Sequence, residues 1–438
     1  MSNVAIGFIV TGGVFFGIAA RIPIGIALLL GSLVGLTLLN GTKVALMLTS
    51  GIPFEFAGEW SLSAIPMFLL MGYIASNTGL ANGIFEALRV SLRRVPGGMA
   101  SATVVASAVF ASASGSSVAT SAAMARIAVP EMLAAGYQRG LAAGCVAAAG
   151  TLGSLIPPSV LMVLYGVFMQ VSIGQLFIAG ILPGLLTAAA YIAMITLRVL
   201  RNPRLAPGDG PPPPPRPAGS GPGFAALWPL PVLIICVMGG IFLGVFSPTE
   251  AGAIGAACAL AISMAAGRFT WTAFVTAVVQ TARGTATIFF VAIGASLFAR
   301  FIGLSGVPEY LKDSLIGATG GNPYLVLFLI SFIFLVLGMF IESIALMLLV
   351  LPVIEPLLAE FGFDYLWFGI IVVKLLEIGL MTPPVGLNVY VIKSALGNAV
   401  DLSEIFKGVG WFIVTDLVLL VLFIIFPGII TVLPEAMK

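Results

Sequence analysis

The sequence predicts an all-α polytopic membrane protein, and two observations carry this prediction. Hydrophobic residues make up 60% of the 438 residues and charged residues only 8%, and the mean hydropathy is +1.17. A soluble domain carries about 25% charged residues, so this chain cannot cover itself with a wetted surface. Apolar stretches close to the roughly 20 residues that span a bilayer recur along the chain. They lie near 4–20, 23–40, 62–80, 178–197, 227–246, 323–351 and 409–433.

The remaining composition excludes several classes of function. The chain has no histidine, which removes histidine-based catalytic triads, the usual zinc ligand sets and histidine proton relays. It has no GxxxxGK[ST] phosphate loop, so we expect no ATP hydrolysis. The three cysteines, Cys145, Cys236 and Cys258, are separate in sequence and are predicted to be small core residues. We therefore expect a non-enzymatic protein that contacts the lipid bilayer and no nucleic acid.

A proline- and glycine-rich segment, "RNPRLAPGDGPPPPPRPAGSGPG" (201–223), divides the chain near its midpoint and is predicted to be a linker. Landmarks recur on its two sides at nearly one offset, which indicates an internal duplication. Pro23 and Pro248 are 225 positions apart, Pro130 and Pro352 are 222 apart, and Pro157 and Pro383 are 226 apart. We therefore predict two repeats, 1–200 and 224–438.

The positions of the basic residues predict the orientation, because Lys and Arg stay cytoplasmic. If residues 4–20 begin outside, 13 of the 19 basic residues lie in the cytoplasm and three lie outside. The other three, Arg126, Arg300 and Lys374, fall within the membrane. Both termini are then periplasmic and the linker is cytoplasmic. The first repeat begins outside and the second inside, so the repeats are inverted, which is typical of secondary transporters.

Each repeat is predicted to contain a re-entrant helical hairpin followed by a broken helix. The hairpins are expected at about 98–135 and 323–360, and the broken helices at about 140–166 and 365–392. Adjacent prolines, Pro157–Pro158 and Pro383–Pro384, remove amide donors and force the preceding residues out of helical geometry. Carbonyls freed at membrane depth are tolerated where they line a cavity or bind a ligand. The alternative is that the prolines only bend the helices for packing.

The first hairpin is expected to turn within "FASASGSSVATSAAMA" (110–125). Gly115 supplies backbone freedom there, and small hydroxyls that can cap a helix or coordinate an ion surround it. These hydroxyls belong to Ser114, Ser116, Ser117 and Thr120. The alternative is a close-packed interface of small residues between helices, which is common in membranes.

The second hairpin is expected to turn at "GMFIESI" (338–344). Glu342 is an acid at membrane depth and is either functional or paired with Arg300 or Lys374. Lys374 and Glu377 are three positions apart on one helix, which predicts a structural salt bridge between them. Asn388, just beyond the second proline pair, is the better candidate to contact an ion or a substrate.

Five segments together resemble the large membrane subunit of tripartite ATP-independent periplasmic (TRAP) transporters, from about residue 4 to 433. They are "SGSSVATSAAMARIAVPEMLAAGY", "GTLGSLIPPSVLMVLYG", "SIGQLFIAGILPGLL", "FSPTEAGAIGA" and "EIGLMTPPVGLNVYV". The resemblance implies sodium-driven symport of a small organic acid, such as a C4-dicarboxylate, a 2-oxo acid or a sugar acid. It also implies a bacterial inner-membrane location, a small four-helix membrane subunit and a periplasmic substrate-binding protein as partners.

The resemblance further implies an elevator-type motion in which 98–172 and 307–394 form most of the moving domain. By motif position it places Na⁺ where each hairpin tip meets a broken helix. The implied sodium-site residues are Ser114, Gly115, Ser116, Gly153 and Pro157 in one half, and Gly338, Gly379, Thr382 and Pro384 in the other. We expect substrate contacts from Ser117, Thr120, Pro158, Glu342, Ser343 and Asn388.

Three other functions remain open from the sequence. The first is a stand-alone sodium/dicarboxylate-type carrier that needs no binding protein. The second is a passive anion channel, which would not depend on a sodium gradient. The third is a membrane enzyme, for which the chain offers no histidine, no cysteine pair and no clustered carboxylates.

Overall fold

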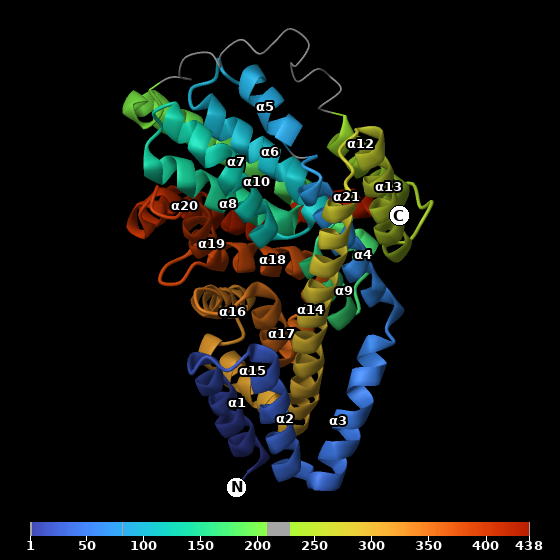
Figure 1. Ribbon diagram of the computed structural model, residues 1–438. Helices are drawn as coiled ribbons and strands as arrows, with labels where there is room; N and C mark the ends of the chain where they lie inside the picture. The colour runs from blue at the N-terminus through green and yellow to red at the C-terminus, as the bar shows by residue number, and fades with distance from the viewer. Residues whose placement is uncertain (1, 81, 208–227, 438) are drawn as a thin grey trace.

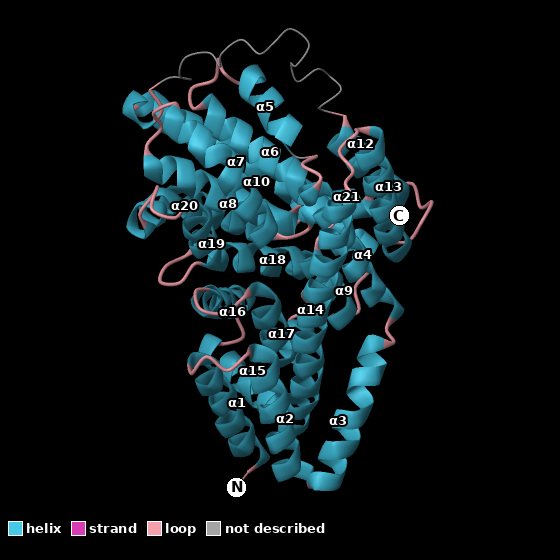
Figure 2. Ribbon diagram, viewed as in Figure 1, coloured by secondary structure: helices cyan, strands magenta, loops and turns pink. Residues whose placement is uncertain are grey.

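A computed structural model describes residues 2–80, 82–207 and 228–437, and these residues form helices and loops without a strand (Figure 2). The all-α prediction is therefore confirmed. The first part comprises α1 (Asn3–Ala19), α2 (Ile24–Asn40), α3 (Thr42–Ala57), η1 (Trp60–Ser63), α4 (Ala64–Asn77), α5 (Asn82–Ser91), α6 (Gly98–Ser114), α7 (Ser117–Ala134), α8 (Arg139–Leu155), α9 (Val160–Phe168), α10 (Ile173–Arg201) and η2 (Pro203–Leu205). The second part comprises α12 (Pro229–Phe242), α13 (Pro248–Ala265), α14 (Trp271–Ser305), α15 (Val307–Thr319), α16 (Pro323–Gly338), α17 (Ser343–Glu360), α18 (Tyr365–Met381), α19 (Leu387–Leu396), α20 (Leu402–Ile425) and α21 (Gly428–Glu435).

Several helices are long and apolar enough to cross a bilayer. Within the described ranges these are α10, α13, α14, α17 and α20, and α8 with α9 adds a sixth span if this bent pair counts as one. The chain bends by 41° between α8 and α9. The predicted linker, 201–223, lies mostly outside the described residues, and its first residues continue α10 and form η2.

The molecule contains two helical hairpins and two broken helices, with α6, α7 and α8 above α18 and with α16 and α17 below it in Figure 1. The hairpins are α6–α7 and α16–α17, and the broken helices are α8–α9 and α18–α19. Helix α8 contacts α6, α7 and α20, while α18 contacts α16 and α17. The long helix α14 runs along the molecule and contacts α2, α4 and α17. The assignment of these elements to two inverted repeats stays a prediction.

Small residues allow the central helices to approach closely. A Cβ on Gly144 of α8 would lie 2.6 Å from the carbonyl carbon of Gly408 on α20, so two backbones are in direct contact there. Close packing of small residues joins helices in membranes. Lipid tails are as apolar as the side chains there, so the hydrophobic effect does not drive the helices together.

The cysteines are only partly as predicted. Cys145 is fully buried in α8 and is a core residue. Cys236 and Cys258 are half-buried free thiols whose Sγ atoms lie 3.4 Å apart across α12 and α13. The expectation that the chain has no cysteine pair was therefore wrong. The packing of α12 on α13 brings together two cysteines that are 22 positions apart in the sequence.

A fully buried ion cluster joins α10, α18 and α20. Lys374 Nζ lies 2.7 Å from Asp416 Oδ1 and 3.4 Å from Glu377 Oε2, and none of the three side chains is exposed. Tyr191 donates a hydrogen bond of 2.6 Å to the other Asp416 oxygen, and Lys374 donates one of 3.3 Å to Thr187. The predicted Lys374–Glu377 salt bridge is confirmed, and Asp416 is an additional partner. Buried charges need such pairing, because removal from water is costly.

We predict that Lys374→Met destabilises the protein by about 3–5 kcal/mol, because it leaves two buried carboxylates without a cation. The midpoint of thermal unfolding in detergent measures the effect. Lys374→Met combined with Asp416→Asn removes one of those carboxylates and should recover part of the loss.

The matched control is Lys312→Met, which breaks a partly exposed ion pair of 3.5 Å with Glu360. Exposed pairs contribute about 0–1 kcal/mol, so this variant should unfold close to the parent. Equal losses in the two single variants would contradict a special role for the buried cluster.

Candidate functional site

The tip of the first hairpin is a tight turn held by its own hydroxyl groups. Helix α6 ends at Ser114, and Gly115 follows with a φ of 60°, a left-handed conformation that favours glycine. Ser116 caps α7 by accepting a hydrogen bond from the Ala119 amide. The Ser114 and Thr120 hydroxyls share a hydrogen bond of 2.8 Å inside the turn.

This tip packs directly against the first broken helix. A Cβ on Gly115 would lie 2.9 Å from the Pro158 carbonyl oxygen, and one on Gly153 would lie 3.0 Å from the Ser116 carbonyl oxygen. The Ser117 and Ser154 hydroxyls share a hydrogen bond of 2.6 Å between α7 and α8. The structure therefore brings the predicted tip residues and Gly153 together, with backbone against backbone.

The tip of the second hairpin is capped by a carboxylate. Glu342 Oε2 accepts hydrogen bonds from the amides of Ile344 (3.1 Å) and Ala345 (3.2 Å) at the start of α17. A carboxylate is stabilised at a helix N-terminus, where the dipole is positive and amides are free. Among the described residues Glu342 forms no ion pair, so its suggested pairing with Arg300 or Lys374 was wrong. The lysine is already paired within the buried cluster.

The second tip also approaches its broken helix through glycines. A Cβ on Gly379 of α18 would lie 2.8 Å from Gly338 Cα and 2.9 Å from its carbonyl oxygen. Thr382 ends α18 in an extended conformation, and its hydroxyl donates a hydrogen bond to the Ile378 carbonyl. Cis peptide bonds follow both breaks, at Pro157–Pro158 and Pro383–Pro384.

The two tips meet at one small cavity of about 80 Å³. Its polar lining comes from both hairpins and from α8, and it is closed by apolar side chains of α4, α9, α14 and α18. The polar side chains are Ser116, Ser117, Ser154, Glu342 and Ser343. A space of at least about 10–15 Å³ with two to four polar partners can hold a water molecule, so this cavity can hold a small ion or waters.

Several predicted site residues do not line this cavity. Thr120 lies beneath the first tip, where it bonds Ser114 and the Ser116 carbonyl. Asn388 is fully buried on α19, and its amide donates a 3.5 Å hydrogen bond to the Ala147 carbonyl. The others outside the cavity lining are Ser114, Gly153, Pro157, Pro158, Gly338, Gly379, Thr382 and Pro384. Ser154 was missed, although its position beside Gly153 and before the proline pair was a usable signal.

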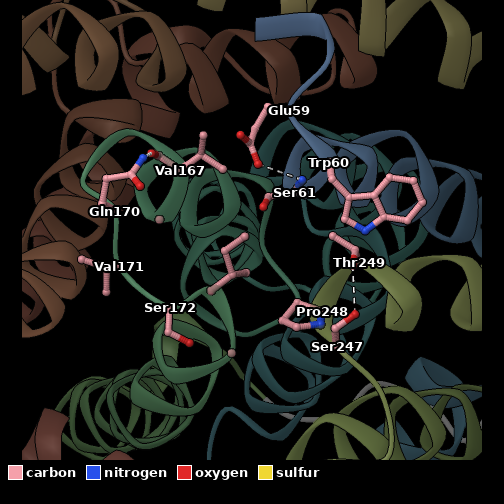
Figure 3. Close-up of a pocket in the computed structure, with 13 residues that line it drawn as sticks. Glu59, Trp60, Ser61, Val167, Gln170, Val171, Ser172, Ser247, Pro248 and Thr249 are labelled. Carbon is pink, nitrogen blue, oxygen red and sulfur yellow. Dashed lines mark hydrogen bonds between the residues drawn. The ribbon is translucent and has the colours of Figure 1, made fainter. Parts of the chain in front are cut away.

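A larger cavity of about 620 Å³ contains none of the predicted site residues (Figure 3). It lies between η1, the α9–α10 turn and the start of α13. Glu59 accepts a hydrogen bond of 3.2 Å from the Ser61 amide at its edge, and Ser247 and Thr249 share one of 2.9 Å. These polar groups form hydrogen bonds within their own short segments, so the cavity offers less convergent chemistry than the space between the tips.

We predict that Gly379→Ala costs about 1–3 kcal/mol of stability, because the new methyl group meets the Gly338 backbone, which cannot move aside as a side chain can. Thermal unfolding in detergent measures it. Gly410→Ala, at a helical glycine with nothing within 4 Å of the new Cβ, is the control and should be neutral or slightly stabilising. A neutral Gly379→Ala would show that α16 and α18 are not in backbone contact.

Comparison with known proteins identifies the family of this chain. Residues 11–429 match the family model of the tripartite ATP-independent periplasmic transporter, DctM component. The chain is 33% identical over 383 residues to the C4-dicarboxylate TRAP transporter large permease protein DctM of Pseudomonas aeruginosa, covering 87% of this chain and 88% of that protein. It is 32% identical to the sialic acid TRAP transporter large permease protein SiaM of Vibrio cholerae, with 92% and 95% covered.

Solved structures with lower sequence identity share the fold. The YdaH transporter of Alcanivorax borkumensis has a TM-score of 0.64 at 18% identity, with 89% of each chain covered. MtrF of Neisseria gonorrhoeae has a TM-score of 0.60 at 13% identity, with 96% of this chain and 94% of that chain covered. At these identities the likeness concerns the fold alone. The family match and the close relatives show that this chain belongs to the DctM component family, the large permeases of TRAP transporters.

Proposed function

We propose that this large permease takes up a small organic acid together with Na⁺, and that the cavity between the two hairpin tips is its cation site. The observation that supports the proposal most directly is that both tips and α8 together line one cavity with four serine hydroxyls and a single carboxylate. Hard monovalent and divalent cations prefer such oxygen ligands. The negative charge of Glu342 favours a cation over a carboxylate in the same space.

The proposed cation site needs both hairpins, because each tip packs against a broken helix. Carbonyls at a break are free to bind a cation, and α6 and α16 end at the tips with the negative C-terminal ends of their dipoles, which favour positive charge. A cation between Ser116, Ser117 and Glu342 would draw together two elements that are far apart in sequence. From the sequence we expected Glu342 and Ser343 to contact the substrate. Because both line this cavity, we propose that they bind Na⁺ instead.

The wider mechanism is part of the same proposal. The hairpins and broken helices would move as one body against the surrounding helices, as in an elevator, with the termini periplasmic and the linker cytoplasmic. The protein is a multi-pass inner-membrane permease by its family. We propose that it works with a small four-helix membrane subunit and a periplasmic binding protein. Relatives are named for C4-dicarboxylates, sialic acid and 2,3-diketo-L-gulonate, which supports an organic acid as the substrate.

Uptake into proteoliposomes tests the proposal. The permease, its small subunit and the loaded binding protein would be supplied with radiolabelled succinate, sialic acid or 2,3-diketo-L-gulonate. We expect accumulation of one of these acids only with an inward sodium gradient and only with the binding protein. Accumulation on sodium alone would indicate a stand-alone carrier, and gradient-independent equilibration would indicate a channel. Either result would contradict the proposal.

We predict that Ser116→Ala raises the sodium concentration for half-maximal uptake by about tenfold, because it removes one hydroxyl from the cavity and the cap of α7. The control is Ser107→Ala on α6, a buried serine of the same hairpin whose hydroxyl has no partner in the described structure and does not line the cavity. It should leave the sodium dependence unchanged. Equal shifts in both variants would place the sodium site elsewhere.

A further inference from the structure

A second polar space adjoins the first hairpin tip on its other side. This groove of about 230 Å³ lies between α4 and α7 and is bounded by Gln280 of α14. On α7 it follows Ala119, Ala122, Ala123 and Arg126, a spacing of three, four and seven positions that forms one helix face. Alanines on this face and Gly72 on α4 leave the space between the helices open.

Arg126 gives this groove a positive charge that no acidic side chain of the described residues balances. It is the one charged residue among the side chains that line the groove. Within the described part of the chain Arg126 forms no ion pair with an acidic side chain. The Arg126 side chain is exposed, so its guanidinium is accessible to an anion that enters the groove. Arg300 differs, because its cavity of about 550 Å³ also contains Glu309 and Glu355.

The opposite wall of the groove supplies neutral hydrogen-bonding groups. Asn77 donates a hydrogen bond of 3.0 Å to Gln280, which orients both amides and leaves the Asn77 oxygen and the Gln280 nitrogen for another partner. Tyr73 of α4 lines the same wall. A single cation opposite amide and phenol groups suits an organic carboxylate with hydroxyl or carbonyl groups along its body.

We propose that the α4–α7 groove binds the organic anion, with the Arg126 guanidinium holding a carboxylate and Asn77 and Gln280 contacting the rest of the molecule. Arginine forms paired, charge-assisted hydrogen bonds with carboxylates, which gives orientation as well as affinity. Pockets for drug-sized ligands measure roughly 300–1,000 Å³, so this smaller groove suits a small acid. The proposal rests on the proposed function and adds the place and the charge that select the substrate.

The position of Ser116 connects this groove with the cation cavity. Ser116 lines both spaces, since the hairpin tip forms a wall of each. A cation that orders the tip on one side therefore shapes the wall of the anion groove on the other. Such a shared wall couples the two ligands through one small turn of the chain.

Charged thiol reagents test the groove by its electrostatic potential, whichever organic acid the protein carries. The native cysteines are replaced by alanine, and Ala123→Cys places a single thiol on the groove wall next to Arg126. The full complex is then treated with sulfonatoethyl and with trimethylammonioethyl methanethiosulfonate. The reaction rate of each reagent is divided by its rate with a free thiol in solution. We expect this normalised rate to be about tenfold higher for the anionic reagent than for the cationic one, because a positively charged cleft raises the local concentration of anions.

Arg126→Gln in the same background should abolish this preference, and Arg300→Gln, the matched control, should retain it. A preference that persists in Arg126→Gln, equal rates in the parent, or no reaction with either reagent would each overturn the proposal. Failure of sodium coupling is a separate result, because it is measured as gradient-dependent uptake and leaves the reagent preference unaffected.

Discussion

The constraint on which this structure depends is that backbone hydrogen-bonding groups inside a membrane must find partners within the protein. Two helices, α8–α9 and α18–α19, break at proline pairs and therefore leave carbonyls without their helical partners. Each hairpin tip packs against the broken helix that follows it in the sequence. Glycines at these contacts allow the two backbones to touch. Gly115 approaches the Pro158 carbonyl, and Gly338 approaches Gly379. A side chain at these positions would separate tip from break and remove the shared cavity.

Lys374, Glu342 and Arg126 are charged residues in three different environments. Lys374 is fully paired by Asp416 and Glu377, which suits a structural cluster that joins helices. Glu342 is satisfied by two amides and still faces a cavity, so it can attract a cation without being destabilising in its absence. Arg126 has neither kind of partner among the described residues and faces a groove lined by neutral groups. The charges that remain available are therefore the ones next to the first and second tips.

Much of the fold could be predicted because it depends on local signals. Apolar length, the proline pairs and the small residues of 110–125 predict helices, breaks and a turn from neighbouring residues alone. The contacts that complete the site could not be predicted, because they join residues far apart in sequence. Asp416 reaches Lys374 from another helix, Ser154 meets Ser117, and Arg126 faces Asn77 and Gln280 only after α4, α7 and α14 have packed. Asn388 is buried on α19 and does not line the cavity between the tips, so its expected contact with an ion or a substrate stays a prediction.

The central claim is that Na⁺ occupies the space between the two hairpin tips. Hydrogen–deuterium exchange of the complex in sodium, potassium or choline chloride at one ionic strength tests it most directly. The account predicts slower amide exchange at 114–118 and 342–345 in sodium than in the other two salts, with little change in α12 or α13. Identical exchange of both tips in all three salts, or protection by sodium at only one tip, would contradict it.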